Sequence, residues 1–328
     1  MGRNLIAFDI GESQVKIAWY NGNTRKKTVC APLIDNLVSG GEILSMDAMA
    51  DFLRDIAGEN HIPHASAAVI LPASLVFTRN IDVPAMTDSQ LGYNLPYEFK
   101  DYLTEEKSSY YFDYAVQELV KDEQGNAKQM HLFACAALKK TIADYREMFR
   151  RAGFRLKSVI PEESAYAALL MAAPDVEGDT CFLDIGYNAV RMLFYRGDSF
   201  VTRRTVNLGT RDLVQTLSEL RGVDTHMAHE HLRSNYENAL NEPALLDLYH
   251  NMAVEIMKVA NFYNYNNREQ MLKRIYLCGG GTAITPLRDA ISELTDIELC
   301  SAADWMPSSA DIESPWLYVK AVGCALQA

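Results

Sequence analysis

The feature that most constrains the fold is a short motif that occurs once in each half of the chain. Phe8-Asp9-Ile10-Gly11 ends an apolar run near the N-terminus, and Leu183-Asp184-Ile185-Gly186 ends a second one in the other half. In both places another apolar or alternating run comes soon after the glycine, which predicts two strands joined by a tight turn. A repeated unit of strand, Asp-x-Gly turn and strand indicates a duplicated, two-lobed α/β protein.

Length and charge narrow the class of protein. The chain has 328 residues, enough for about two lobes with a sizeable core. With 48% hydrophobic and 23% charged residues it is an ordinary globular protein, which excludes disordered and fibrous classes. The formal net charge is -12 and Lys and Arg are not clustered, so we expect no nucleic-acid partner.

The N-terminal segment lacks the apolar core of a signal peptide, and no stretch approaches the ~20 apolar residues that a spanning helix needs. We therefore expect a cytoplasmic protein without direct membrane insertion. Six cysteines occur singly, which favours buried free thiols over a metal site or disulfides. His226, His229 and His231 lie close together, but the last two point to different helix faces, which disfavours a metal site.

The order of predicted elements divides the chain into five segments. A strand, hairpin, helix and strand form the first lobe, and a later run of strand, helix, two strands and helix has its own turn signals and predicts an inserted α+β subdomain. The segments are the first lobe, 1–73; the inserted subdomain, 74–154; a connection, 155–173; the second lobe, 174–313; and a closing helix that returns to the first lobe, 314–328.

The first Asp-x-Gly hairpin has residues suited to a phosphate. Gly11 lets backbone N–H groups converge on an anion, Ser13 adds a hydroxyl donor and Lys16 adds a positive charge. Asp9, at the strand end, is placed to hold the waters around a magnesium ion. One such turn is common in ordinary hairpins. Two of them facing one another could clamp a polyphosphate from both sides.

A glycine triplet is the third element of this pattern. Gly279, Gly280 and Gly281 follow the predicted strand 274–277, and their missing side chains would let a flat ring and a ribose lie against the backbone at a helix start. A triplet alone is more often a plain loop. In this order, after two Asp-x-Gly hairpins, it favours a nucleotide site.

These motifs together resemble the actin-like ATPase superfamily. The octapeptide 9–16 is similar to the first phosphate motif, and segments 162–167 and 318–326 resemble the two connecting helices. Glu230 and Arg233 stand where the superfamily has a Glu-x-x-Lys that contacts the adenosine. The resemblance implies a two-lobed, ribonuclease H-like duplicated fold that binds ATP or ADP with Mg²⁺.

The resemblance also implies the site residues. Those expected to bind the nucleotide are Asp9, Gly11, Glu12, Ser13, Gln14, Lys16, Gly186, Tyr187, Asn188, Gly209, Glu230, Arg233, Gly279, Gly280, Gly281 and Thr282. Asp9 and Asp184 would hold magnesium through water, and Asp184 would orient the attacking water. The second hairpin carries Tyr187 and Asn188 where the superfamily has hydroxyl residues. We therefore expect hydrolysis to be absent or slow, and the protein to be at most a slow ATPase.

Within the superfamily the chain is most similar to the PilM family of type IV pilus assembly proteins, itself similar to the division protein FtsA. Segments 71–79, 83–86 and 95–98 resemble the way that family leads into its inserted subdomain, and 134–140 and 152–154 the way it leaves. The resemblance implies an ATP-binding scaffold at the inner face of the cell membrane. Its nucleotide state would set the angle between the lobes and so its fit to a partner.

The expected partner is the cytosolic N-terminal tail of a PilN-like inner-membrane protein, docked by the inserted subdomain on residues that the sequence does not specify. Formation of a homo-oligomer is compatible with this role. An FtsA-like division filament protein is the first alternative, against which stand the short length and the lack of a basic amphipathic tail before Ala328. The second is a small-molecule kinase, although the zinc cluster and Gly-Thr-Gly turn of compact sugar kinases are missing.

Overall fold

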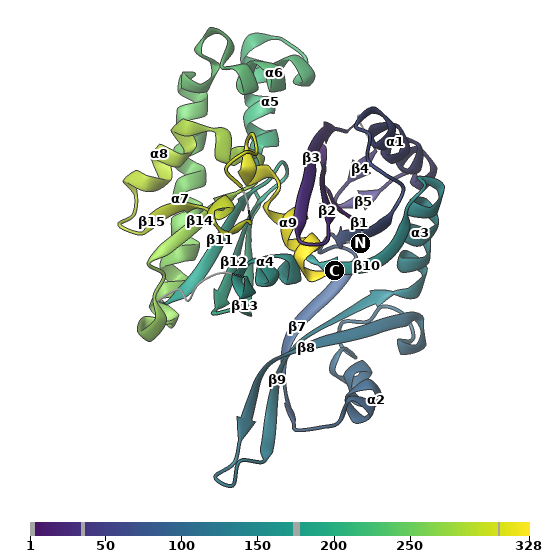
Figure 1. The fold of residues 1–328 in the computed structure, drawn as a ribbon. Coiled ribbons are helices and arrows are strands. Elements are labelled where there is room, and N and C mark those ends of the chain that lie inside the picture. The colour runs from purple at the N-terminus through teal and green to yellow at the C-terminus, as the bar shows by residue number, and fades with distance from the viewer. Residues whose placement is uncertain (1–3, 34–36, 173–177, 308) are drawn as a thin grey trace. The chain divides into compact units, whose positions relative to one another are not determined.

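The chain forms two units, each built on its own sheet. The computed structural model describes residues 4–33, 37–172, 178–307 and 309–328. The units comprise Met1–Met171, Asp198–Phe200 and Lys320–Ala328 in unit 1, and Ala172–Gly197 and Val201–Val319 in unit 2 (Figure 1). The predicted boundary between 173 and 174 lies outside the described residues.

The sheet of unit 1 has the order β10-β6-β1-β2-β3. β1 pairs antiparallel with β2, and β2 with β3, whereas β6 runs parallel to both β1 and β10. The strands are β1 (Asn4–Ile10), β2 (Gln14–Asn21), β3 (Thr24–Pro32), β6 (Ser66–Leu71) and β10 (Arg155–Pro161), with a small hairpin of β4 (Val38–Ser39) and β5 (Glu42–Ile43).

Helices cover both faces of this sheet. Because side chains alternate along β1, Ile6 and Phe8 pack with α1 (Met46–Glu59) and α3 (Lys139–Arg151). Ala7 points the other way, into a smaller core with residues of α4 (Glu162–Met171) and α9 (Val319–Gln327). Asp9 continues this second face, so the candidate metal-binding carboxylate lies on the α4 and α9 side of the sheet.

The inserted subdomain is a three-stranded antiparallel sheet, β7-β9-β8, with one helix. Its elements are β7 (Val76–Pro84), α2 (Asp88–Glu98), a 3₁₀ turn (Lys107–Ser109), β8 (Tyr110–Lys121) and β9 (Ala127–Leu138). Thr87 is the N-cap of α2 and forms a capping box with Gln90. The helix ends at Glu98, where Phe99 is buried in the core and the chain turns.

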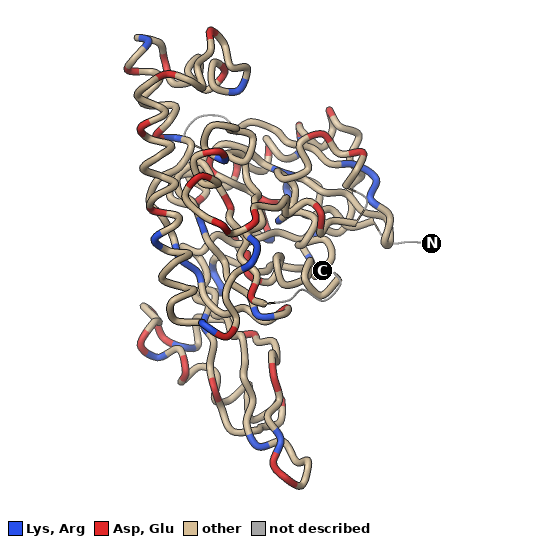
Figure 2. Tube along the Cα trace, turned by 90° about the vertical axis from the view of Figure 1, so that its left-hand side faces the viewer, with Lys and Arg blue, Asp and Glu red and all other residues tan. Residues whose placement is uncertain are grey.

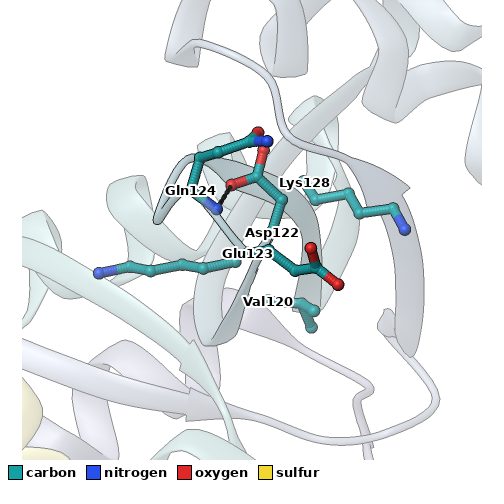
Figure 3. A pocket seen from close by; sticks show the side chains of 6 residues that line it. Val120, Asp122, Glu123, Gln124 and Lys128 are labelled. Carbon is teal, nitrogen blue, oxygen red and sulfur yellow. Dashed lines mark hydrogen bonds between the residues drawn. The ribbon is translucent and has the colours of Figure 1, made fainter.

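The loop between β8 and β9 is a turn held by one carboxylate. Asp122 accepts hydrogen bonds from the backbone N–H groups of Gln124 at 2.9 Å and Asn126 at 2.8 Å, and these bonds lower its pKa. Figure 3 shows the open hollow beside this turn, lined by Val120, Lys121, Asp122, Glu123, Gln124 and Lys128. These contacts explain the turn itself and need no ligand.

Unit 2 repeats the strand order of unit 1. Its sheet is β13-β12-β11-β14-β15, in which β11 and β12 form the antiparallel hairpin and β14 runs parallel to both β11 and β15. The strands are β11 (Asp179–Ile185), β12 (Val190–Arg196), β13 (Ser199–Val206), β14 (Arg274–Cys278) and β15 (Glu298–Ser301). The same strand order in both sheets confirms the predicted two-lobed α/β fold with a duplicated unit.

The helices of unit 2 pack against this sheet through residues such as Leu213, Tyr249, Ile256 and Leu287. They are α5 (Thr210–Arg221), α6 (Thr225–Ser234), α7 (Pro243–Asn266) and α8 (Thr285–Glu293), with 3₁₀ turns at Tyr236–Asn241, Arg268–Gln270, Gly280–Ala283, Ala302–Trp305 and Pro315–Leu317. Acidic and basic residues are interspersed along the described chain (Figure 2).

All six cysteines are free thiols, as expected. Cys181, Cys278 and Cys324 are buried, and the other three are half-buried. Among the described residues, no three His, Cys, Asp or Glu side chains gather in a group that could hold a metal ion. Nor does any helix in that part of the chain combine the length and apolar character needed to cross a membrane.

Candidate functional site

The two Asp-x-Gly motifs form turns of the same geometry. In unit 1 the backbone N–H of Gly11 donates to the carbonyl of Gln14 at 3.0 Å, and in unit 2 that of Gly186 donates to Ala189 at 3.1 Å. Each turn joins the first two strands of its sheet in the same register. The structure therefore places both motifs in equivalent hairpins, as their sequences predict.

Each hairpin sets a cation opposite its aspartate. Lys16 pairs in register with Asp9, and its Nζ lies 3.3 Å from where a Cβ on Gly11 would be. Arg191 takes the equivalent position opposite Asp184, with Nη1 3.7 Å from the Cβ position of the second glycine. The sequence analysis missed Arg191. Counting the same number of residues from each Asp to the basic residue would have found it.

The two aspartates are buried carboxylates at strand ends. Asp9 is 4% and Asp184 2% exposed. Oxygen ligands of this kind fit a magnesium ion that keeps several of its waters. In unit 1, Asp9 Oδ1 also lies 3.6 Å from Nζ of Lys320 on α9, a residue that the sequence analysis did not select.

The other side chains of the first hairpin divide into two groups. Glu12 accepts a hydrogen bond from the backbone N–H of Gly41, and Gln14 Oε1 accepts one from the Cys30 thiol at 3.3 Å. Both are therefore engaged within unit 1. Ser13 makes no side-chain hydrogen bond to any described residue, so its hydroxyl, like the Lys16 ammonium, is suited to an anion.

The second hairpin is fastened to the start of α5. The N–H groups of Thr210 and Arg211 donate to the carbonyls of Gly186 at 3.1 Å and Tyr187 at 2.9 Å. A Cβ on Gly209 would lie 2.2 Å from the Tyr187 carbonyl oxygen, so only glycine allows this approach. These first donors of the helix thus bond to the hairpin itself. The Asn188 amide makes no hydrogen bond to a described residue.

The glycine triplet packs differently from the expected open platform. A Cβ on Gly279, whose φ is +84°, would lie 2.4 Å from Asp184 Oδ1, and one on Gly281 would lie 2.1 Å from Ile185 Cγ2. Two of the three glycines therefore let β14 approach the end of β11. Only Gly280 is open, with its nearest neighbour 4.0 Å from the Cβ position.

The triplet also does not open a helix, contrary to the prediction. The N–H of Thr282 donates to the Gly279 carbonyl at 3.2 Å, which closes a 3₁₀ turn, and α8 begins only at Thr285, where Pro286 suits the first turn. Thr282 is 5% exposed, and its hydroxyl oxygen has no hydrogen-bond partner in the described part of the chain. A buried hydroxyl of this kind beside the triplet fits a polar ligand.

Glu230 and Arg233 form an ion pair on one turn of α6. Arg233 Nη2 lies 2.6 Å from Glu230 Oε2, and this hydrogen bond lowers the pKa of Glu230. Arg233 is exposed and Glu230 is half-buried. A contact from Arg233 to a nucleotide would therefore have to compete with Glu230.

A family model described as type IV pilus assembly protein PilM matches residues 7–319. The chain belongs to this PilM family. The match confirms the predicted resemblance and favours the pilus assignment over the FtsA-like and kinase alternatives. No curated protein matches the chain in sequence.

Two solved structures share the fold of this protein. One is titled "PilM-PilN type IV pilus biogenesis complex", with a TM-score of 0.77 and 20% identity over 98% of this chain and 97% of that one. The other is the ethanolamine utilization protein EutJ from Carboxydothermus hydrogenoformans, with a TM-score of 0.63 and 12% identity over 99% and 89%. At these identities the likeness extends to the fold alone.

Proposed function

We propose that this protein is a nucleotide-binding scaffold of a type IV pilus assembly machine, held at the inner face of the cell membrane by a PilN-like partner. The observation that supports it most is the PilM family match over residues 7–319. The shared fold with a PilM chain from a PilM–PilN complex agrees with it.

The nucleotide would be ATP or ADP, and the Asp-x-Gly hairpins would supply groups that bind its phosphates. Lys16 and Arg191 would supply positive charge to the phosphates, and the Ser13 hydroxyl and Asn188 amide would donate hydrogen bonds. Asp9 and Asp184 would hold the waters of a magnesium ion, which when bound neutralises phosphate charge. Gly280 and Thr282 would lie along the nucleoside.

Hydrolysis would be slow or absent. Asp184 is the only residue that we assign to orient a water, and Tyr187 and Asn188 provide no aliphatic hydroxyl beside it. We expect turnover well below about 1 per second, a rate that ordinary enzymes reach. Turnover at kinase-like rates would overturn the scaffold proposal.

The partner would dock on the inserted subdomain. Its sheet has β8 at one edge, and an extended peptide can add to such an edge through main-chain hydrogen bonds. Exposed tyrosines on the same subdomain offer amphipathic anchors. They are Tyr93, Tyr97, Tyr102 and Tyr111.

Two titrations test the proposal. ATP binding is measured by calorimetry with and without Mg²⁺ on the wild-type chain and on Asp9→Ala and Lys16→Ala, which should both bind more weakly. A peptide from the N-terminal tail of the PilN-like membrane protein is then titrated into the wild type, the Lys100→Glu variant of the inserted subdomain and the Lys26→Glu variant of β3 as control. Both replaced lysines are exposed.

Weaker peptide binding by Lys100→Glu, with Lys26→Glu and ATP affinity unchanged, supports docking on the inserted subdomain. If a complete surface scan of residues 74–154 leaves peptide binding unchanged, that part of the proposal is wrong. If millimolar ATP gives neither heat nor a rise in Tm, the nucleotide site is vestigial.

A further inference from the structure

The closing helix covers the carboxylate that ends β1. Leu5 and Ala7, which share the face of β1 with Asp9, pack against Cys324 of α9 and Ala165 of α4. Asp9 is the next residue on that face, at the strand end. The first turn of α9 carries Lys320.

Lys320 Nζ lies 3.6 Å from Asp9 Oδ1, and the two side chains are only 17% and 6% exposed. Solvent and salt therefore screen this pair much less than an ion pair on the surface. The position is also unusual for a lysine, because the N-terminal end of a helix carries partial positive charge and disfavours a cation. The aspartate supplies the negative charge that offsets this cost.

The negative charge of Asp9 affects the pKa of two neighbouring thiols, Cys324 and Cys30. Burial raises the pKa of the Cys324 thiol, one helical turn beyond Lys320, and Asp9 raises it further. Burial likewise raises the pKa of Cys30, where Lys16 lowers it and Asp9 raises it. The Asp9 carboxylate thus has the ammonium group of Lys320 beside it and Lys16 paired with it in register on β2.

We propose that Lys320 is the resident counter-ion of Asp9 and competes with a divalent cation for this carboxylate. The inference rests on the proposed nucleotide function. A magnesium ion that approaches Asp9 through its waters would bring a second positive charge beside the ammonium, and the two repel one another. Metal binding therefore requires Lys320 to move away from Asp9, and Lys320 lowers the dependence of nucleotide binding on Mg²⁺.

The test measures this dependence as the ratio of the Kd for ADP in EDTA to the Kd in Mg²⁺. Calorimetry is carried out on the wild-type chain, Lys320→Met and Lys320→Arg. Removing the competing charge should raise the ratio about tenfold in Lys320→Met, the size of an ordinary coupling between two sites. Lys320→Arg keeps the charge and should stay near the wild type.

Lys140→Met is the matched control, because Lys140 is an exposed lysine whose Nζ pairs with Asp144 at 2.6 Å, on α3. The ratio of the two Kd values for ADP should be the same in Lys140→Met as in the wild type. If Lys320→Met does not fold, Lys320→Gln gives the same readout. Thermal unfolding of the metal-free chain provides a second one: Lys320→Met should lower Tm, and adding Asp9→Asn should restore part of the loss, because it removes the unpaired buried charge.

The outcomes separate the two proposals. An unchanged ratio in Lys320→Met, in a wild-type chain that binds ADP, overturns the role of Lys320 and leaves the nucleotide function standing. The pairing is also contradicted if adding Asp9→Asn restores none of the Tm that Lys320→Met loses. A wild-type chain that binds ADP in neither condition overturns the nucleotide function and this inference with it.

Discussion

The three glycines of the triplet differ in what surrounds them, and this difference can be measured. An alanine at Gly281 would place its Cβ 2.1 Å from Ile185 Cγ2 and 3.0 Å from Thr210 Cγ2. Ile185 is fully buried, so its side chain has little room to move away. We expect Gly281→Ala to lower the free energy of unfolding by about 1–3 kcal/mol, as overpacking of a core does. Urea unfolding measures the change.

Gly280→Ala is the matched control, because its Cβ would find nothing nearer than 4.0 Å. Its unfolding free energy should stay within about 0.5 kcal/mol of the wild type. Equal losses in both variants would contradict the packing role assigned to Gly281. A fall in ADP affinity of Gly280→Ala alone would add support for a nucleoside at this position.

At the scale of residues, the sequence predicts those site residues that lie close together along the chain. Asp9, Gly11 and Lys16 belong to one hairpin, so their spacing alone indicates how they meet. Lys320 could not be found in the same way, because it meets Asp9 only after the chain has passed through unit 2 and α9 has packed on the sheet. The role of Gly281 depends likewise on its tertiary neighbour Ile185.

At the scale of elements, one carboxylate ties the first hairpin to the small β4–β5 hairpin. Glu12 accepts the N–H of Gly41, a residue with φ +82° whose Cβ would lie 2.8 Å from Ser74 Oγ. We expect Glu12→Ala to cost about 1 kcal/mol of unfolding free energy, the usual worth of a hydrogen bond. It should also speed exchange of the Gly41 amide hydrogen, which NMR follows directly.

Glu12→Gln is the control for this link, since its side-chain carbonyl can still accept the same hydrogen bond. Exchange at Gly41 should then stay close to the wild type. The link is refuted if alanine and glutamine have the same effect on exchange.

The ion pairs of α3 predict a pH dependence. Hydrogen bonds from Arg150 and then Arg151 lower the pKa of Glu147 from 4.5 to about 2. A lowered pKa contributes stability that is complete above 4.5 and is lost as the pH falls toward 2. The difference in unfolding free energy between wild type and Glu147→Gln should therefore be constant above about pH 5 and shrink below it.

Urea unfolding at several pH values between 7 and about 2.5 measures this difference. Glu105→Gln removes another exposed carboxylate, one without an ion pair to a described residue, and serves as the control. A difference between wild type and Glu147→Gln that does not change below pH 4 would disprove the assignment.

In the five-stranded sheet of unit 1, the sequence does not predict the two outer strands, and the reason is the same for both. β3 (Thr24–Pro32) and β10 (Arg155–Pro161) are the outer strands of their sheet, and most of their residues are only partly buried. An edge strand with few apolar residues has little of the alternation that predicts a strand. The central strands β1, β6 and β11 are apolar throughout most of their length, and all three were predicted.

At the scale of the whole molecule, the duplication was predictable because both copies keep their Asp-x-Gly turn. In unit 1 and unit 2 alike, short turns join the neighbouring antiparallel strands, whereas the parallel strands are joined by long connections that contain helices. The sequence predicts less well which unit the last helix packs on. α9 follows unit 2 in the chain, yet Lys320–Ala328 belong to unit 1.

This return makes the stability of unit 1 depend on the last helix of the chain. At Gly323, α9 crosses α4 so closely that a Cβ would lie 2.0 Å from the Ala165 carbonyl oxygen and 2.7 Å from its carbon. Both are backbone atoms of a buried helix and cannot rotate away. Although alanine favours a helix over glycine by about 1 kcal/mol, we expect Gly323→Ala to destabilise the chain by about 1–3 kcal/mol, because the two helices must separate.

Gly92→Ala in α2 is the control that measures the helix propensity of alanine alone, without a close contact like that of Gly323 with α4. Gly92 is an exposed helical glycine with nothing within 4 Å of its Cβ position, so alanine there should stabilise the chain by about 0.5–1 kcal/mol. In urea unfolding, we expect the unfolding free energy to fall in Gly323→Ala and to rise in Gly92→Ala. The same separation should move Lys320 from Asp9, so Gly323→Ala should also increase the Mg²⁺ dependence of ADP binding, as Lys320→Met does. A stabilised Gly323→Ala variant would show that α9 does not pack on α4 through this glycine.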